Sequence, residues 1–212
     1  MDTAVRTGAW SPSGAPLPYD AEVEWLEYTG SQYIKTDIIP AVGYTYKMKF
    51  RSTAVVNYGY LFGVNWKNDA GVIKFFGIRR LISQAKFQSQ SFSIGTVPYE
   101  EDIDYDITIN GGEAGTLNEF RLADGRVFSH NSKINVSPTL PMNLFAVNNN
   151  GGAAYQNKAR LYSFSIESNG EAILDLIPVR KGNIGYMYDR VSGRLFGNAG
   201  TGEFVIGPDK TT

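Results

Sequence analysis

The residues that first suggest chemistry form a glycine-rich run at positions 197–202, with the sequence Gly-Asn-Ala-Gly-Thr-Gly. Such runs occur in loops that hold a phosphate, where a helix follows the loop and its free N–H groups bind the anion. The next residues, 203–206, read Glu-Phe-Val-Ile, which is typical of a strand, and no Lys-Ser or Lys-Thr pair directly follows the run. We therefore predict turns between short strands, in which glycine supplies the positive φ.

A second candidate is the acidic run Glu-Glu-Asp-Ile-Asp at 100–104. In an extended strand, alternation would place Glu100, Asp102 and Asp104 on one face. Carboxylates gathered in this way act as general acid and base, or they bind calcium. Residues 103–109 continue the alternation with apolar side chains on the opposite face, which favours a solvated polar face above a core. We expect this polar face, with catalysis and a calcium site as alternatives.

Other catalytic groups are sparse. The sequence has no cysteine and a single histidine, His130, which excludes thiolate metal sites and clusters of several histidines. A Ser-His-Asp relay would have to run through His130, which lies in a predicted turn, VFSHNSK at 127–133. The Gly-x-Ser-x-Gly motif of many hydrolases does not occur. We predict that the protein is not an enzyme and needs no cofactor.

Two predicted loops carry the residue types that bind sugars. An aromatic ring stacks on the apolar face of a pyranose, while amides and carboxylates bind its hydroxyl groups. The first loop, GVNWKNDAG, covers 63–71, and the second, VNNNGGAAYQN, covers 147–157. The alternatives are a tryptophan folded back onto the core and asparagines that only form turns. The predicted ligand-binding residues are Trp66, Asn68, Asp69, Asn148, Asn149, Asn150 and Tyr155.

The hydrophobic pattern predicts a scaffold made of strands. Apolar and polar residues alternate in YTYKMKFR at 44–51, in IDYDITI at 103–109 and in RLYSFSI at 160–166, where Tyr162 is in phase with the apolar residues. Gly- and Asn-rich turn signals separate the runs, and no amphipathic helix of three turns is evident. We predict an all-β, two-sheet antiparallel β-sandwich over residues 21–212. Further strands are expected at 32–39, 59–64, 72–78, 85–94, 118–122, 142–147, 173–179, 184–189 and 203–206.

Residues 1–20 are rich in proline and glycine and are predicted to form an extended N-terminal arm. One interpretation is a disordered leader. The other is an arm that anchors the protein to a partner through Trp10, Pro12 and Pro16. The charged and apolar stretches of a secretion signal are not visible at this end of the sequence.

The overall charge argues against two classes of partner. The sequence has 20 Lys and Arg residues against 21 Asp and Glu residues, a net charge of −1, and no basic run. The positive field that drives binding to nucleic acids or anionic membrane surfaces is therefore absent. No stretch approaches the roughly 18 apolar residues of a membrane-spanning helix. We expect no nucleic-acid partner and no membrane insertion.

Three segments resemble one recurring module: EWLEYTGSQYIKTDIIP at 24–40, ARLYSFSIESNGEAILDLIPVRK at 159–181 and GYMYDRVSGRLFGNAGTGEFVIG at 185–207. Together they are similar to the laminin-G-like, concanavalin A-like modules of gut-bacterial surface proteins and of virion proteins of their phages, over about residues 22–207. The resemblance implies a jelly roll of two curved antiparallel sheets that serves recognition or adhesion, often of glycans. It also allows a calcium ion at the rim, as in some relatives.

The last of these segments also supports a structural role. We expect Tyr186 and Tyr188 to share a strand face, and Asp189 to accept backbone hydrogen bonds in the turn that follows.

Some enzymes of this fold, the laminarinase-type glycoside hydrolases, carry Glu, an apolar residue, Asp, an apolar residue and Glu on one strand. The acidic run departs from this pattern, because its second position is the charged Glu101 and its last acid is the shorter Asp104. A retaining glycosidase needs its carboxyl groups about 5–5.5 Å apart, and a shortened side chain works against that spacing. A degenerate β-glucanase therefore ranks below a binding protein.

The function that the resemblance implies is recognition or adhesion without catalysis, with a glycan or another cell-surface ligand. The module would be displayed on the surface of a phage virion, where the arm contacts other virion proteins. One alternative is a structural decoration or assembly protein of the virion without a glycan ligand. Another is an adhesin module that forms part of a larger bacterial protein at the cell surface.

Overall fold

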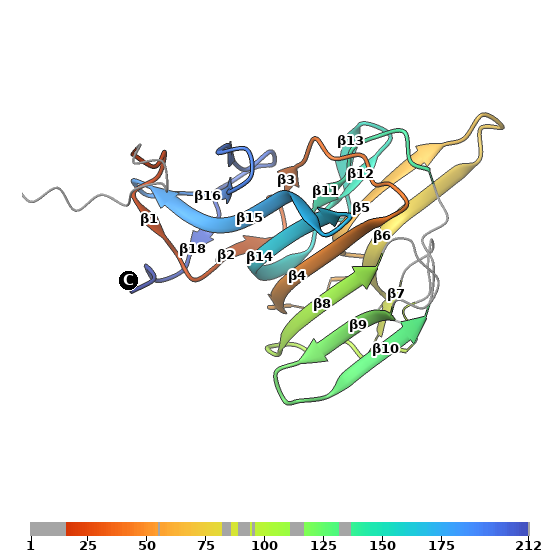
Figure 1. Cartoon of the computed structure of the whole chain (residues 1–212), viewed down its shortest axis with the longest axis horizontal. Coiled ribbons are helices and arrows are strands. Elements are labelled where there is room, and N and C mark those ends of the chain that lie inside the picture. The colour runs from red at the N-terminus through yellow and green to blue at the C-terminus, as the bar shows by residue number, and fades with distance from the viewer. Residues whose placement is uncertain are drawn as a thin grey trace, which may run out of the picture.

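The computed structural model describes residues 16–54, 56–81, 86–88, 94, 96–110, 117–131 and 137–211. Within these residues the chain is all-β, and its strands form two sheets that pack in a sandwich-like arrangement (Figure 1). None of the described segments is a helix long and apolar enough to cross a membrane. Residues 1–15 of the predicted arm, including the predicted anchor residues Trp10 and Pro12, lie outside the described residues.

Among the described residues, the larger sheet has eleven strands. In chain order they are β1 (Ala21–Glu22), β2 (Leu26–Thr29), β4 (Tyr44–Ser52), β8 (Asp104–Asn110), β9 (Leu117–Leu122), β10 (Val127–Asn131), β14 (Lys158–Ser168), β15 (Glu171–Lys181), β16 (Ile184–Asp189), β17 (Leu195–Phe196) and β18 (Val205–Ile206). The main path runs β10-β9-β8-β4-β14-β15-β16-β17, while β1 joins β15, β2 joins β14 and β18 joins β2. All the pairings within this sheet that involve described residues are antiparallel.

The smaller sheet has seven strands in the part of the chain that the structure describes. They are β3 (Ile34–Lys35), β5 (Tyr60–Lys67), β6 (Ile73–Leu81), β7 (Lys86–Gln88), β11 (Asn143–Leu144), β12 (Val147–Asn149) and β13 (Gly152–Ala154). β11 pairs with β5 antiparallel, but β12 pairs with β5 parallel. The chain direction therefore reverses between β11 and β12, where Phe145 has a φ of +56°. The prediction of a purely antiparallel sandwich is wrong for this sheet.

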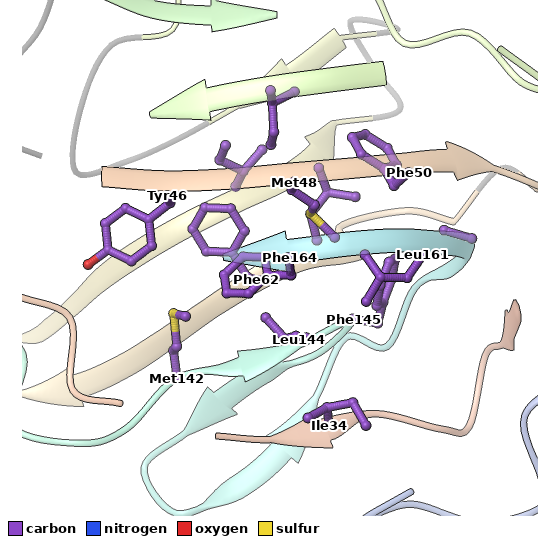
Figure 2. Packing of buried hydrophobic residues seen from close by; sticks show 14 of the residues in the cluster. Ile34, Tyr46, Met48, Phe50, Phe62, Met142, Leu144, Phe145, Leu161 and Phe164 are labelled. Atoms are coloured by element: carbon purple, nitrogen blue, oxygen red, sulfur yellow. The ribbon is translucent and has the colours of Figure 1, made fainter. Parts of the chain in front are cut away.

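The core lies between the two sheets and is filled by alternate residues of the strands (Figure 2). Tyr46, Met48 and Phe50 of β4 are buried, as predicted for 44–51, and the Tyr46 ring stacks on Phe62 of β5 with centroids 5.7 Å apart. Burial of each large apolar side chain contributes about 1.5–3 kcal/mol. The side chains between them point outward, and this leaves a polar outer face on the larger sheet.

A β-bulge in β14 moves Tyr162 to that outer face. The pairing of β14 with β4 shifts its register between Leu161 and Ser163, so Leu161 and Phe164 are both buried although they are three residues apart. Tyr162 is half-buried, and its hydroxyl donates a hydrogen bond to Asp104 at 2.8 Å. The prediction that Tyr162 is in phase with the core residues is therefore wrong, because a bulge inserts one extra residue and resets the alternation.

The three segments that carry the resemblance lie together in the structure. β2 pairs with both β14 and β18, and the glycine-rich run closes over residues 31 and 32. Ser31 Oγ donates to the Thr201 carbonyl at 3.0 Å, and Gln32 Nε2 donates to the Glu203 carbonyl at 2.9 Å. A Cβ on Gly200 would lie 2.0 Å from the Ser31 carbonyl oxygen. The run leads into strand β18, and its interpretation as turns is confirmed.

The first described residues pack on the outer face of the larger sheet. Tyr19 contacts the Tyr188 ring edge-on, with centroids 4.9 Å apart, and Leu17 packs in the same small apolar cluster. Tyr186 also belongs to this cluster, so Tyr186 and Tyr188 share a face as predicted. Pro16 is exposed. The last residues of the predicted arm thus lie against their own domain.

Candidate ligand-binding site

A pocket of about 330 Å³ opens on the outer face of the larger sheet. Strands β4, β8 and β14 and the end of β9 form its walls, and most of its polar groups come from alternate, outward-facing positions of these strands. Its lining residues are Lys49, Asp104, Tyr105, Asp106, Arg121, Leu122, Ala123 and Tyr162.

Strand register brings the charged residues of the pocket together. Arg51 lies opposite Asp104 and Lys49 opposite Asp106 on the β4–β8 pair, and Arg121 lies opposite Asp106 on the β8–β9 pair. Residues directly opposite on antiparallel strands are neighbours on one face. Arg51 donates from Nε and Nη2 to the Asp104 carboxylate at 2.6 and 3.0 Å, and Lys49 Nζ lies 3.2 Å from Asp106 Oδ2. Positive and negative groups therefore alternate across the pocket.

The protonation states of the pocket follow from these contacts. Burial by itself would raise the pKa of Asp104, but hydrogen bonds from Arg51 and Tyr162 outweigh it and the pKa is lowered. Burial, and then the hydrogen bond to Asp104, raise the pKa of Tyr162 to about 12. At neutral pH the pocket therefore holds an ionised carboxylate beside a protonated phenol.

We expect Asp104→Asn to make stability less sensitive to acid. Because the pKa of Asp104 is lowered by folding, its ionised form stabilises the fold above the unfolded carboxyl pKa of about 3.9. This contribution is lost as the pH falls through the lower folded pKa. Urea titrations at a series of acidic pH values should show that the free energy of unfolding falls less steeply for Asp104→Asn than for the unmodified chain.

Arg51→Gln is the matched background for this measurement. It removes the guanidinium that lowers the pKa of Asp104. Adding Asp104→Asn to Arg51→Gln should therefore change the pH dependence of the free energy of unfolding less than it does in the unmodified chain. If the free energy of unfolding fell equally steeply with acid in Asp104→Asn and in the unmodified chain, this would contradict the lowered pKa of Asp104.

The arrangement is suited to binding hydroxyl groups. The carboxylates of Asp104 and Asp106 accept hydrogen bonds, Lys49 and Arg121 donate them, and Tyr162 contributes a ring beside the polar groups. Ligand pockets in proteins combine a few placed polar groups in this way with a cavity of roughly 300–1,000 Å³. The pocket is at the lower end of that range and can hold a ligand of one or two sugar rings.

The acidic run that suggested catalysis does not form one polar strand. β8 begins only at Asp104, and Asp102 has a φ of +57°. The Glu100 carboxylate accepts hydrogen bonds from both terminal nitrogens of Arg126, at 2.6 and 2.8 Å. The prediction that Glu100, Asp102 and Asp104 share a strand face is therefore wrong, because the residues before Asp104 turn. The polar face over 103–109 is confirmed from Asp104 onward, with alternate residues buried.

Trp66 lies in a strand and not in a loop. β5 continues to Lys67, and the indole of Trp66 belongs to the core with 5% of its surface exposed. The prediction of an exposed tryptophan is wrong, and the alternative of a side chain on the core is confirmed. Asn68 and Asp69 do lie in the β5–β6 connection, where Asn68 Oδ1 accepts a hydrogen bond from the Val72 N–H at 2.8 Å and Asp69 is exposed.

The three consecutive asparagines build the β12–β13 hairpin. Asn148 is buried, and its side chain accepts a hydrogen bond from the Gly151 N–H at 2.8 Å. Asn150 and Gly151 have φ values of +53° and +100°, as in a type I′ turn. Asn149 is exposed and accepts a hydrogen bond from Asn65 at 3.4 Å. The interpretation of these residues as turn formers is therefore confirmed.

The structure places the predicted sugar-binding residues on separate surfaces. The Asn150 N–H donates to the Asn65 carbonyl in the later half of β5, on the side of the β5–β6 connection. Tyr155 lies at the opposite end of β5, where its carbonyl accepts from the Tyr60 N–H at 3.1 Å, and its ring faces Tyr58. Tyr155 is 53% exposed. Tyr155 and the asparagines thus belong to separate surfaces.

Sequence reasoning missed most of the pocket. Lys49, Asp106 and Arg121 were visible only as the polar positions of alternating strands, which is also the pattern of any solvated face. These three side chains lie close together only because of the strand pairing and its register, and a single sequence does not reveal either. The bulge in β14 also places Tyr162 on the face opposite to the one that simple alternation predicts.

Metal-binding groups do not gather in the described part of the chain. No set of three or more His, Asp or Glu side chains there is placed to hold an ion. His130 is exposed on β10 opposite Asn118. The prediction of a turn at His130 is wrong, because 127–131 pairs with β9 as a strand.

The comparisons with known proteins add no family assignment. No protein-family model matches this sequence, and no curated protein matches it. A functional proposal therefore depends on the pocket, on the exposed side chains around the sheets and on the segments that carry the resemblance.

Proposed function

We propose that this protein is a non-enzymatic recognition module that binds a neutral carbohydrate in the pocket formed by β4, β8, β9 and β14. The observation that carries the proposal is a pocket of about 330 Å³ whose lining combines Tyr162 with two carboxylates and two cations: Asp104, Asp106, Lys49 and Arg121. Neighbouring hydroxyl groups of a sugar can each find an acceptor and a donor there.

The charge pattern of the pocket favours a neutral ligand. The two carboxylates are each paired with a cation, Asp104 with Arg51 and Asp106 with Lys49. A strongly charged ligand would have to break one of these pairs and would leave one partner uncompensated. Hydroxyl groups can instead add hydrogen bonds to the free lone pairs and N–H groups without displacing a charge.

We propose a non-enzymatic role because Asp104 does not fit the general acid that glycoside hydrolysis requires. A general acid in such a site has a raised pKa, whereas its partner stays ionised. The pKa of Asp104 is lowered by its hydrogen bonds, which favours the ionised form and opposes proton donation at neutral pH. Asp104 therefore fits an acceptor for a hydroxyl group better than an acid catalyst.

The finer fold and the location form part of the same proposal. We propose a concanavalin A-like jelly roll of the laminin-G-like kind, displayed on the surface of a phage virion or within a bacterial surface protein. The three segments that carry this resemblance pack together around β2, β14, β16 and β18. Their contacts support the interpretation of the segments as one structural unit.

Glycan-array screening tests the ligand. We expect the purified, labelled protein to bind neutral glycans, with and without calcium in the buffer. Asp106→Ala and Lys49→Ala should each weaken binding roughly tenfold or more, because each removes a charged hydrogen-bonding group. Both side chains belong to the pocket lining.

Lys47→Ala is the matched control for Lys49→Ala. Lys47 lies two residues away on the same face of β4, pairs with Glu167 at 2.6 Å and is not part of the pocket lining. Its binding should equal that of the unmodified protein. The absence of binding to any glycan in both buffers would contradict glycan recognition. If the protein released reducing ends from β-glucans and Asp104→Asn abolished this release, the result would favour the glucanase alternative.

A further inference from the structure

A second surface, distinct from the pocket, gathers aromatic side chains at the start of β5. Tyr58 precedes the strand and Tyr155 follows β13, and both rings are exposed, by 38% and 53%. Tyr60, the first residue of β5, is buried, and its ring centroid lies 6.3 Å from that of Tyr155. The guanidinium of Arg79 on β6 lies 5.0 Å from the Tyr58 centroid. We call Tyr58, Tyr155 and Arg79 the tyrosine surface.

The two exposed rings form a corner. The centroids of Tyr58 and Tyr155 are 6.4 Å apart and their planes meet at 67°, so one ring presents a face where the other presents an edge. Arg79 packs against Tyr58 and also lies 5.9 Å from the Tyr60 centroid. This cation–π stacking holds the Tyr58 ring in place. The corner is therefore a preformed aromatic shape and not a pair of independent side chains.

The backbone holds both tyrosines in an unusual conformation. Tyr58 and Tyr155 have φ values of +58° and +52°, in the left-handed region that bulky residues seldom adopt. Backbone hydrogen bonds on either side fix them: the Tyr60 N–H donates to the Tyr155 carbonyl at 3.1 Å, and the Arg80 N–H donates to the Gly59 carbonyl at 3.0 Å. The fold thus keeps two rings exposed where glycine or asparagine would fit the backbone more easily.

Each of the two tyrosines has an amide residue next to it in the chain. Asn57, exposed, precedes Tyr58, and Gln156, half-buried, follows Tyr155. Two exposed rings beside amide side chains and a guanidinium make an amphipathic patch. A six-membered ring with an apolar face and hydroxyl groups at its edge fits such a patch.

We propose that the tyrosine surface is a second carbohydrate site, which stacks one pyranose ring of a neutral saccharide against Tyr155 and Tyr58. The ligand class rests on the proposed function, whereas the site itself rests on separate residues. The pocket lies on the outer face of the larger sheet, and the tyrosine surface lies at the end of β5 in the smaller sheet. The module therefore has two contact points for a polysaccharide and not one.

Fluorine NMR on protein labelled with 3-fluorotyrosine tests both sites in one spectrum. The resonances of Tyr58, Tyr155 and Tyr162 are assigned by the signal that each Tyr→Phe variant loses. The probes are cellotetraose, laminaritetraose, mannotetraose and chitotetraose. We expect at least one of them to shift the Tyr58 and Tyr155 resonances in a saturable way.

Substitutions at position 155 identify the stacking. Tyr155→Phe keeps the ring and should retain binding at the tyrosine surface, as read from the Tyr58 resonance. Tyr155→Leu removes the ring but keeps an apolar side chain, and it should weaken this binding roughly two- to tenfold. The other tyrosine signals of Tyr155→Leu should remain dispersed, which verifies that the variant is folded.

Each outcome decides one or both proposals. Shifts confined to Tyr162 would overturn the tyrosine surface and leave the pocket in place. Shifts confined to Tyr58 and Tyr155 would support the tyrosine surface and count against the pocket. The absence of a shift at all three positions, with every probe, would overturn both sites. Equal affinity of Tyr155→Leu and Tyr155→Phe would overturn the stacking.

Discussion

The Gly77→Ala variant is expected to lose on the order of 3–5 kcal/mol of its free energy of unfolding. Gly77 lies in the middle of β6, directly opposite Gly63 of β5. A Cβ at position 77 would lie 2.2 Å from the Phe62 carbonyl oxygen and 2.6 Å from the Gly63 Cα. Both obstacles are backbone atoms, so no side-chain rotation relieves the clash.

Backbone conformation adds to the cost at this position. Gly77 has a φ of +137°, which residues with a Cβ rarely adopt. The β5–β6 pair would have to separate, and Phe62 and Phe76, both fully buried, would lose their packing. Urea titration followed by tryptophan fluorescence should show a much lower midpoint, or the variant should accumulate as unfolded protein.

Gly152→Ala is the matched control for Gly77→Ala. Gly152 lies in β13 of the same sheet, and a Cβ there would meet only the Asn149 carbonyl oxygen, 3.9 Å away. Its stability should stay within about 0.5 kcal/mol of the unmodified chain. Similar losses in the two variants would show that the close approach of β5 and β6 is not the cause.

The Asp189→Ala variant is expected to lose about 3 kcal/mol, because it removes the acceptor of several hydrogen bonds at once. Asp189 is 2% exposed. Its carboxylate accepts hydrogen bonds from the N–H groups of Asp175, Val191 and Ser192, at 2.8, 3.1 and 3.2 Å, and from the Ser192 hydroxyl at 2.5 Å. Without it, the donors on β15 and in the turn after β16 lose this acceptor.

Asp189→Asn distinguishes the loss of the hydrogen-bond acceptor from the loss of the charge, and Asp69→Ala serves as a control. Asp189→Asn keeps one acceptor oxygen and should lose roughly half as much stability as Asp189→Ala. Asp69→Ala, in the exposed β5–β6 connection, should have little effect. Denaturant titrations of the three proteins provide the comparison, and Asp189→Ala with the stability of Asp69→Ala would refute the role of the carboxylate.

The strands that the sequence predicted well are those with one buried face. In β4 and β8 one set of alternate residues is buried and the other contacts solvent, so the period of two is visible. β5 differs, because nearly all of its residues are buried on both faces. A strand of that kind has no alternation, and the polar residues Asn65 and Lys67 on either side of Trp66 therefore suggest a loop.

The candidate sites were predicted only in part. Tyr155 was selected for its type, and the structure confirms that it is exposed. Its partners Tyr58 and Arg79 come from segments about 100 and 76 residues away along the chain, brought together by pairing within the smaller sheet. The pocket depends in the same way on the order β9-β8-β4-β14. Strand order and register are properties of the whole fold, and local pattern does not determine them.

The two ends of the domain lie side by side and run in opposite directions. Val23 bridges Asp209, Leu26 pairs with Ile206, and the Lys210 N–H donates to the Glu22 carbonyl at 2.9 Å. Tension applied between the two ends would load these pairs one after another, starting at the contact between Glu22 and Lys210. Because β1 and β2 are also paired with β15 and β14, we expect β18 and the residues after it to separate from them first.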